Sequence, residues 1–206
     1  MRAPARLFLA SSNPGKLAEF RALAQTGALS SQVELELIPG FDSLPSFKEN
    51  AATFAENALG KALRYSELTE GFVFADDSGL VVPALGGAPG VHSARYAGPN
   101  ATSAERISKL LGELRGMRGS QRAAHFVCAI ALAKQGHAIE IVTDRVEGEI
   151  LSSPSGSGGF GYDPVFYYPP LKKTFAELSP HEKNQHSHRG KAFRKLLAAL
   201  DVSQAR

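Results

Sequence analysis

The sequence contains a single cysteine, Cys128, among its 206 residues, so no disulfide can form within the chain. The neighbours of this cysteine in "HFVCAIALA" are apolar, which indicates a buried thiol and a reducing compartment. A long hydrophobic run is also lacking, because the apolar piece near the N-terminus reaches a helix-start signal within a few residues. This pattern is typical neither of a secretion signal nor of a membrane span. We therefore expect a cytoplasmic protein without a membrane partner.

Internal repeats, low-complexity segments and a Pro/Gly/Ser-rich linker are absent as well. Hydrophobic residues make up 43% and charged residues 21%, which are ordinary values for a globular protein. The net charge of +3 suits a polyanionic ligand but is common in proteins that have none, so it discriminates little. The sequence therefore predicts one domain over residues 1–206.

Apolar residues alternate between strand and helix patterns along the chain. A capping box at Thr102 and Glu105 opens one helix, and a Gly-containing turn at Gly136 separates strands that we expect to be antiparallel. We predict an α/β fold with a mixed central sheet flanked by helices. The expected strands are 6–10, 33–39, 72–75, 123–133, 138–143, 146–151 and 163–168, and the expected helices are 14–23, 51–68, 102–114 and one from about residue 189.

The segment "SSNPGK" follows the first expected strand. Asn13 fits a helix N-cap and Pro14 the first helical position, so free backbone N–H groups and Lys16 would lie at a positive helix end. This arrangement favours an anion site, although an ordinary capped helix explains the residues equally well. It is not a P-loop, because Leu17 replaces the required Ser or Thr after the lysine.

Two adjacent aspartates, Asp76 and Asp77, follow the expected strand 72–75 in "FADDSGL". Ligand sites of open α/β sheets gather at the carboxyl ends of strands, and two neighbouring carboxylates call for a compensating cation. Mg²⁺ would satisfy them, because it takes oxygen ligands and needs few from the protein when phosphates supply the rest. A turn in which Asp77 and Ser78 bind nearby backbone is the structural alternative.

The stretch "GSGGFGYDP" packs four glycines around Phe160, so that its backbone can approach a ligand and Phe160 or Tyr162 can stack on a flat ring. A flexible loop is the alternative. Further on, Lys183, His188 and Arg189 form a donor-rich turn before the last helix. The histidines at 181, 186 and 188 lack the regular spacing of metal ligands, so we expect them to bind no metal.

Together these blocks are similar to one known family. "SSNPGK", "TFAENAL", "ADDSGL", "LGGAPGVHSARYAG", "GGFGYDPVF" and "SHRGKAF" resemble, in order and spacing, the inosine-triphosphate pyrophosphatase family, from about Leu7 to about Leu200. The resemblance implies an elongated α/β fold with a cleft between two lobes, usually in a homodimer. It also implies Mg²⁺-dependent hydrolysis of non-canonical purine nucleoside triphosphates to the monophosphate and pyrophosphate, which cleanses the nucleotide pool.

The resemblance also implies roles for individual residues. Asp77 matches the catalytic acid/base and metal-associated carboxylate, Asp76 a partner in the surrounding shell, and Glu49 the acidic position that helps to hold Mg²⁺. The segment around Glu49 departs from many relatives, which leaves Glu56 as a second candidate. The residues that match substrate contacts are Ser11, Ser12, Asn13, Pro14, Gly15, Lys16, Ser78, Phe160, Gly161, Tyr162, Asp163, Lys183, His188 and Arg189.

The hydrogen-bond donors of "SHRGKAF" suggest how the protein would discriminate between purine bases. Hypoxanthine and xanthine carry an oxygen at the six-position where adenine carries an amino group, so a donor such as Arg189 pairs with the first and opposes the second. We expect Asp77 to activate a water for attack at the α-phosphorus, with Lys16 stabilising the leaving pyrophosphate. Two other readings remain open: a non-catalytic nucleotide-binding or RNA-binding module, and a phosphatase that releases orthophosphate.

Overall fold

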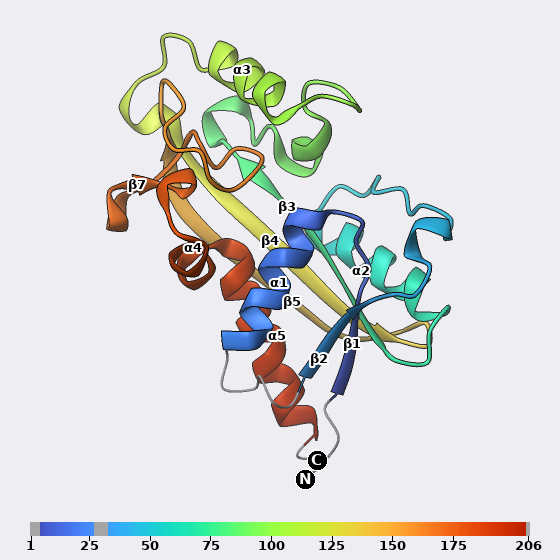
Figure 1. The fold of residues 1–206 in the computed structure, drawn as a ribbon. Helices are drawn as coiled ribbons and strands as arrows, with labels where there is room; N and C mark the ends of the chain where they lie inside the picture. The colour runs from blue at the N-terminus through green and yellow to red at the C-terminus, as the bar shows by residue number, and fades with distance from the viewer. Residues whose placement is uncertain (1–4, 27–32, 205–206) are drawn as a thin grey trace. The chain divides into compact units, whose positions relative to one another are not determined.

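The computed structural model describes residues 5–26 and 33–204. A seven-stranded sheet with the strand order β2-β1-β3-β4-β5-β6-β7 forms its centre (Figure 1). No helix in the described ranges is long and apolar enough to cross a membrane. The strands are β1 (Ala5–Leu9), β2 (Val33–Leu37), β3 (Phe72–Val81), β4 (Ala123–Lys134), β5 (His137–Ile150), β6 (Phe166–Tyr168) and β7 (Lys173–Thr174), and the α-helices are α1 (Pro14–Thr26), α2 (Phe54–Ser66), α3 (Ser103–Glu113), α4 (Pro180–His186) and α5 (His188–Gln204).

The sheet is mixed, as predicted. Strand β1 pairs in parallel with both β2 and β3, whereas β6 pairs antiparallel with β5 and β7. A two-residue turn joins β4 to β5, and both of its residues have positive φ, 50° at Gln135 and 77° at Gly136. Such a turn matches the twist of a hairpin and places β4 and β5 antiparallel. The α/β fold class is therefore confirmed.

The chain divides into two compact units, each with its own core. The first unit comprises residues 1–77, 128–144 and 189–206, and the second comprises residues 78–127 and 145–188. The prediction of a single domain stays a prediction. We describe each unit by itself.

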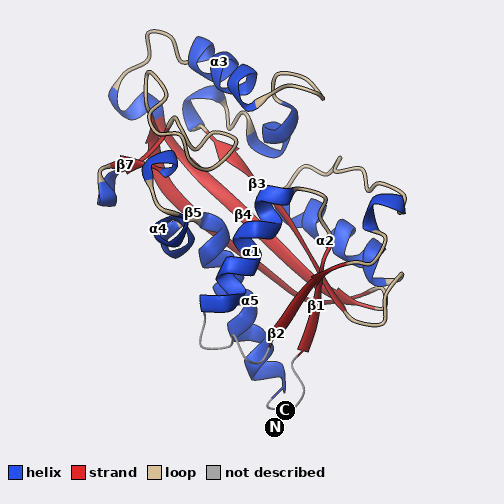
Figure 2. Ribbon diagram, in the orientation of Figure 1, coloured by secondary structure: helices blue, strands red, loops and turns tan. Residues whose placement is uncertain are grey.

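In the first unit, successive strand residues point to opposite faces of the sheet, and helices cover both faces (Figure 2). Leu7, Leu9 and Phe74 pack with Phe20 of α1 and Phe193 of α5. On the other face, alternate residues of the same strands pack against α2. That second cluster includes Phe8, Ala10, Val73, Ala75, Ala58 and Ala62. Cys128 lies in the first cluster, where burial raises the pKa of its thiol.

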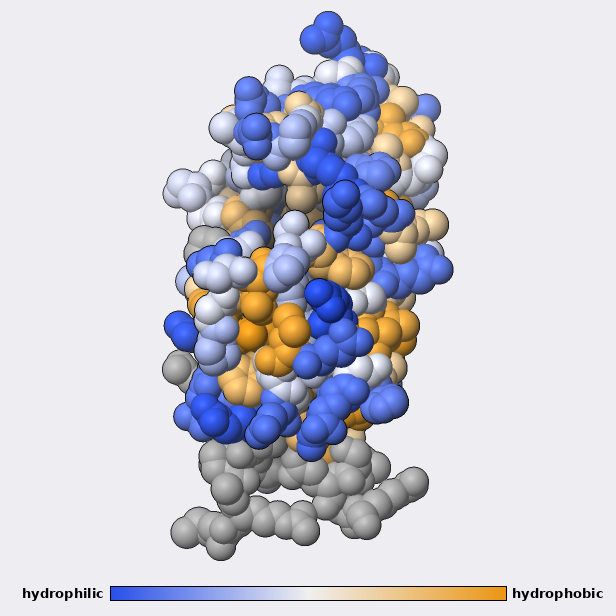
Figure 3. All heavy atoms as spheres, turned by 90° about the vertical axis from the view of Figure 1, so that its right-hand side faces the viewer, coloured by the Kyte–Doolittle hydropathy of each residue, from blue (hydrophilic) through white to orange (hydrophobic). Residues whose placement is uncertain are grey.

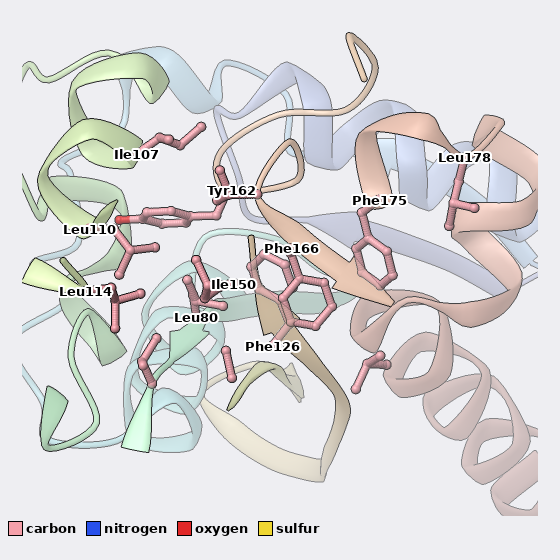
Figure 4. Packing of buried hydrophobic residues seen from close by; sticks show 14 residues of the cluster. Leu80, Ile107, Leu110, Leu114, Phe126, Ile150, Tyr162, Phe166, Phe175 and Leu178 are labelled. Atoms are coloured by element: carbon pink, nitrogen blue, oxygen red, sulfur yellow. The ribbon is translucent and has the colours of Figure 1, made fainter. Parts of the chain in front are cut away.

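The second unit has a core rich in aromatic residues (Figure 4). Phe126, Phe166 and Phe175 lie within 5.9 Å of one another, measured between ring centroids. Helix α3 adds Leu110 on its inward side. Aromatic contacts at this spacing contribute beyond the apolar area that they bury, so this cluster anchors the elements that carry the second unit's candidate residues.

Polar caps fix where the helices begin. Thr102 and Glu105 form the predicted capping box of α3, in which Glu105 N–H donates to Thr102 Oγ1 at 3.2 Å. The same pattern begins α2 at Thr53, and it begins α4 at Ser179. Helix α4 was not predicted, although the Ser179 capping box is a signal that the sequence contains.

Three strand predictions need correction. Strand β3 does not end at residue 75 but continues to Val81, so Asp76, Asp77 and Ser78 lie inside it and form no turn. The strands expected at 138–143 and 146–151 are one strand, β5, and β6 is shorter than expected. Charged residues interrupt the apolar pattern in β3 and β5, but hydrogen bonding to neighbouring strands keeps their backbone extended. Residues 163–165, expected to begin β6, form a turn instead.

The face drawn in Figure 3 has small groups of apolar side chains among polar ones. Over the described residues, the exposed large hydrophobic side chains are Leu37, Leu68, Ile139 and Ile141, at 37% to 45% exposure.

Candidate active site

The two adjacent aspartates lie in β3, where neighbouring side chains point to opposite faces of the sheet. Asp76 shares its face with Phe74 and thus with the α1 and α5 side. Asp77 shares its face with Val73 and Ala75 and thus with the α2 side. Strand geometry therefore points the two carboxylates to opposite faces, although the charges of Lys16 and Lys61 act on both.

Asp76 is fully buried and is surrounded by cations of the first unit. Its Oδ2 lies 2.9 Å from Lys16 Nζ and 3.6 Å from Arg189 Nε. Burial alone would raise the pKa of Asp76, but the charges of Lys16, Arg189 and Lys61 outweigh it and hold the pKa well below its usual range. Asp76 is therefore anionic, and its contacts hold the Lys16 ammonium at the start of α1.

Arg189 occupies a position that the sequence did not indicate. Arg189 is 2% exposed, and its guanidinium makes an ion pair with Glu19 of α1, in addition to its contact with Asp76. The charges of Glu19 and Asp76 outweigh burial and raise the pKa of Arg189 further, so the group stays charged. The prediction that Arg189 reads the base stays a prediction; in this structure its guanidinium contacts the buried Asp76 and the half-buried Glu19 of the first unit.

Asp77 is 6% exposed and accepts a hydrogen bond from Asn57 Nδ2 at 2.9 Å. The Asn57 amide is itself oriented by Ala51 N–H, which donates to Asn57 Oδ1 at 2.9 Å. Burial and the nearby charge of Glu49 raise the pKa of Asp77 to about 6, although the Asn57 hydrogen bond opposes the shift. The Asp77 carboxyl thus titrates close to neutral pH, as suits a general base.

Glu49 and Lys61 lie on the same side as Asp77. The Glu49 carboxylate makes an ion pair with Lys61 Nζ. Burial would lower the pKa of Lys61, but the charges of Glu49, Asp76 and Asp77 together outweigh it and raise the pKa. No group of three His, Cys, Asp or Glu side chains that would hold a metal occurs among the described residues. Two neighbouring carboxylates whose repulsion raises a pKa nevertheless fit a cation that takes most of its ligands from phosphate and water.

Asn57 and Lys61 were missed by the sequence reasoning. They lie one helical turn apart in α2 and are buried beside Ala58 and Ala62, on the face that packs against the sheet. The sequence does contain a signal for them, because Asn57 and Lys61 are polar residues at helix positions where the spacing predicts apolar ones. Glu56, the alternative to Glu49, binds the N-cap Thr53 instead, with its Oε2 2.8 Å from Thr53 Oγ1.

The loop before α1 has the predicted N-cap, and this cap occupies two of the amides that were expected to be free. Asn13 Oδ1 accepts from Gly15 N–H at 2.9 Å and from Lys16 N–H at 3.2 Å. Asn13 N–H in turn donates to Ser11 Oγ at 3.2 Å. Because the cap already uses these donors, an anion at this loop would meet the Lys16 ammonium, which also pairs with Asp76, and the hydroxyls of Ser11 and Ser12.

In the second unit, Asp163 connects Phe160 and Lys183. Asp163 Oδ2 accepts from Lys183 Nζ at 2.7 Å and from Phe160 N–H at 2.8 Å. Lys183 Nζ also lies 4.6 Å from the centroid of the Phe160 ring. Asp163 and Lys183 are buried, whereas Phe160 is half-buried, so a fixed ion pair supports a partly open aromatic ring.

Most glycines of this loop allow close packing of the loop against its own chain. A Cβ on Gly159 would lie 2.2 Å from Asp163 Oδ2, and one on Gly156 would lie 2.6 Å from the Ala176 backbone. Gly158 N–H donates to Ala176 O at 3.0 Å. Only at Gly161, among these four glycines, would an added Cβ meet nothing within 4 Å. The loop is therefore packed against its own chain at three of its four glycines.

The remaining candidates of the second unit differ in their surroundings. Tyr162 is 4% exposed in the aromatic core and donates its hydroxyl to Ser93 O at 2.9 Å, so its ring does not stack on a ligand as predicted. His188 is buried and stacks on Phe126 at 4.7 Å between ring centroids. Ser78 is half-buried in β3.

The pKa of Asp77 predicts how stability depends on pH. In metal-free protein the folded state holds the Asp77 proton up to about pH 6, whereas the unfolded chain loses it near pH 4. Asp77 therefore contributes to the free energy of unfolding at low pH. This contribution, at most about 3 kcal/mol, is lost as the pH rises from about 4 to about 6.

This expectation is tested by urea unfolding of wild type and Asp77→Asn at several pH values in the presence of a chelator. The variant should match the wild type near pH 4 and become the more stable protein above pH 6. Asp42→Asn, at an exposed aspartate, should show no such divergence. Parallel curves for wild type and Asp77→Asn would contradict the raised pKa.

The fold and these contacts define an α/β protein that gathers buried carboxylates and lysines around one strand. The chain belongs to the Ham1 family, whose model matches residues 7–199. It is 51% identical over 191 residues to a dITP/XTP pyrophosphatase of Geobacillus kaustophilus, with 92% of this chain and 91% of that protein covered. A second dITP/XTP pyrophosphatase, from Gloeobacter violaceus, is 51% identical over 193 residues, with 93% and 92% covered.

Solved structures support the same grouping. A HAM1 protein from Coxiella burnetii matches with a TM-score of 0.83 and 42% identity, over 97% of this chain and 99% of that one. A structure described as a nucleoside-triphosphatase and dITP/XTP pyrophosphatase from Mycobacterium abscessus matches with a TM-score of 0.71 and 39% identity, over 93% and 98%.

Proposed function

We propose that the protein hydrolyses non-canonical purine nucleoside triphosphates, namely inosine, deoxyinosine and xanthosine triphosphates, to the monophosphate and pyrophosphate. The observation that carries the proposal is Asp77, a buried carboxylate whose pKa is about 6 and which lies in one unit with Lys16 and Lys61. Such a hydrolysis needs a general base that titrates near neutral pH and cations that bind phosphate beside it. The names of the relatives support this substrate class.

In the proposed reaction Asp77 accepts a proton from the water that attacks the α-phosphorus. Asn57 holds the Asp77 carboxylate in one orientation through its 2.9 Å hydrogen bond. The ammonium groups of Lys16 and Lys61 balance the charge of the triphosphate and of the leaving pyrophosphate. Asp76 acts through Lys16, because its 2.9 Å contact fixes the position of that ammonium group.

Mg²⁺ is the proposed cofactor, held by Asp77 and Glu49. When bound, it would neutralise phosphate charge and lower the cost of developing charge on the leaving group. The Glu49 carboxylate pairs with Lys61 in this structure, so binding of the ion would exchange one positive partner of Glu49 for another.

For recognition of the purine base, we propose that the Phe160 ring stacks on it and that the Lys183 ammonium donates to its six-oxo group. An ammonium group has donors and no acceptor, so it pairs with the oxygen of hypoxanthine and not with the amino group of adenine. Ser78, Gly161 and His188 complete the proposed nucleoside contacts, with the Ser11–Lys16 loop at the phosphates. We further propose a cytoplasmic homodimer that acts on free nucleotides without a nucleic-acid or membrane partner.

An assay of inosine, xanthosine and adenosine triphosphates with Mg²⁺, in which pyrophosphate and orthophosphate are resolved, tests the proposal. We expect pyrophosphate from the first two and a kcat/KM at least ~10²-fold above that for ATP, as when a buried donor is left unpaired. Release of orthophosphate would instead identify a phosphatase. Binding without turnover would identify a nucleotide-binding module, and equal values for ATP and inosine triphosphate would refute the base selection.

A further inference from the structure

A hollow lies in the second unit, and its lining contains none of the candidate site residues. It has a volume of about 730 Å³ and is lined by the C-terminal part of α3 and by the loop that follows. This loop reads "LRGMRGSQR" from Leu114 to Arg122. Ligand pockets commonly have volumes of about 300–1,000 Å³, so the hollow can hold a nucleotide-sized molecule.

Arg122 forms a fixed, positively charged wall of this hollow. Its guanidinium donates to Ile150 O at 2.6 Å, to Leu151 O at 2.7 Å and to Leu114 O at 3.0 Å. All three partners are backbone carbonyls, so no carboxylate neutralises the guanidinium through these bonds. The loop is thereby held in place, and a positive charge is built into it.

Arg115 and Arg118 add two exposed charges to the lining. Within the described part of the chain, neither residue forms an ion pair, and no acidic side chain lines the hollow. The acidic residue that is nearest in sequence, Glu113, is bound elsewhere: its carboxylate accepts from the Tyr96 hydroxyl and lies 4.0 Å from Lys109 Nζ. The hollow therefore has three positive charges and no negative one.

Apolar and open surfaces complete the lining. Leu111 and Met117 are half-buried and supply apolar contacts. Gly112 lies in helix α3, and a Cβ added there would meet nothing within 4 Å. We propose that this hollow binds a phosphorylated small molecule of nucleotide size, with its phosphate on Arg115 and Arg118 and its flat or apolar part against Leu111 and Met117. This proposal does not depend on the proposed catalytic function.

The sequence offers a local reporter, because it has only two methionines, Met1 and Met117. Protein labelled with ¹³C-methyl methionine gives two methyl signals by NMR, and Met117→Leu assigns them. Adenosine monophosphate is the probe, because its amino group at the six-position is disfavoured by the proposed base site. We expect AMP to shift the Met117 signal in a saturable way, also in a Lys16→Ala protein.

Two variants test the lining separately. A double variant, Arg115→Ala with Arg118→Ala, should raise the Kd for AMP at least ~10-fold, because two charge-assisted contacts are lost. Gly112→Leu should raise the Kd for AMP by a similar factor without changing any charge. Gly112 lines the hollow at an open helix position, so the leucine side chain would occupy the space of the ligand. Arg21→Ala with Arg64→Ala, which removes two surface charges from the first unit, is the matched control and should leave binding unchanged.

Each other outcome overturns the proposal in part or entirely. No shift of the Met117 signal at ~10 mM AMP would show that the hollow is not a site for this ligand class. Equal affinity for adenosine and AMP would exclude the arginines as phosphate ligands. Equal affinity for inorganic phosphate and AMP would exclude the apolar wall, and unchanged binding in the arginine variant would place the ligand elsewhere.

Discussion

Asp77→Asn is expected to lower kcat for inosine triphosphate by at least ~10²-fold, the lower end of the effect of losing a general base. The amide has nearly the same shape as the carboxylate, and its oxygen can still accept from Asn57 Nδ2, which lies 2.9 Å from the carboxylate in the wild type. It cannot accept the proton of the attacking water, and it offers no negative charge to a cation. The loss should therefore appear in kcat rather than through unfolding.

Two controls separate this effect from a general disturbance. Asp42→Asn, at an exposed aspartate, should retain wild-type kcat. The Asp77→Asn protein should remain folded, and at pH 7 it should be at least as stable as the metal-free wild type. Near-full activity of Asp77→Asn would remove this residue from the mechanism.

Arg189→Met is expected to destabilise the protein by about 3–5 kcal/mol, the usual cost of removing one partner from a buried ion pair. Methionine has a similar length but leaves Glu19 and Asp76 without the guanidinium that now lies between them. Lys16 still neutralises Asp76, so the larger part of the effect should come from Glu19. For a protein of about this size, such a loss lowers Tm by roughly 6–20 °C.

Arg145→Met is the matched control, because Arg145 forms an ion pair with Glu147 in which both side chains are more than 60% exposed. Its loss should cost at most about 1 kcal/mol. A double variant, Glu19→Gln with Arg189→Met, should recover part of the stability, since it removes the unpaired charge. If Arg189→Met proved no more destabilising than Arg145→Met, the buried network would not have the importance assigned to it.

Local features of this fold follow from the sequence. The capping box at Thr102 and Glu105 places the start of α3 correctly, because it depends only on residues three positions apart. Asn13 was likewise identified as the cap of α1. The end of β3 was not identified, since two aspartates and a serine in a strand look like a turn until the partners of Asp76 and Asp77 are known.

The candidate site follows from the sequence only in part, for the same physical reason. Lys16 and Asp76 belong to separate motifs, and the pair of Arg189 with Glu19 joins residues 170 positions apart, which no local pattern predicts. The resemblance of "SHRGKAF" to a base-reading block placed Arg189 at the base. In the structure that arginine joins an ion network with Glu19 and Asp76, and Lys183, beside Phe160, is a second donor that the same block does not contain.

Hydrolysis of inosine triphosphate in ¹⁸O-labelled water most directly tests the central claim, that water attacks the α-phosphorus and releases pyrophosphate. Water that attacks this atom becomes part of the monophosphate, whereas water that attacks the β-phosphorus leaves its oxygen in the pyrophosphate. We predict that ³¹P NMR and mass spectrometry of the products will show one ¹⁸O in inosine monophosphate and none in pyrophosphate. Labelled pyrophosphate, or labelled orthophosphate as the product, would contradict the account.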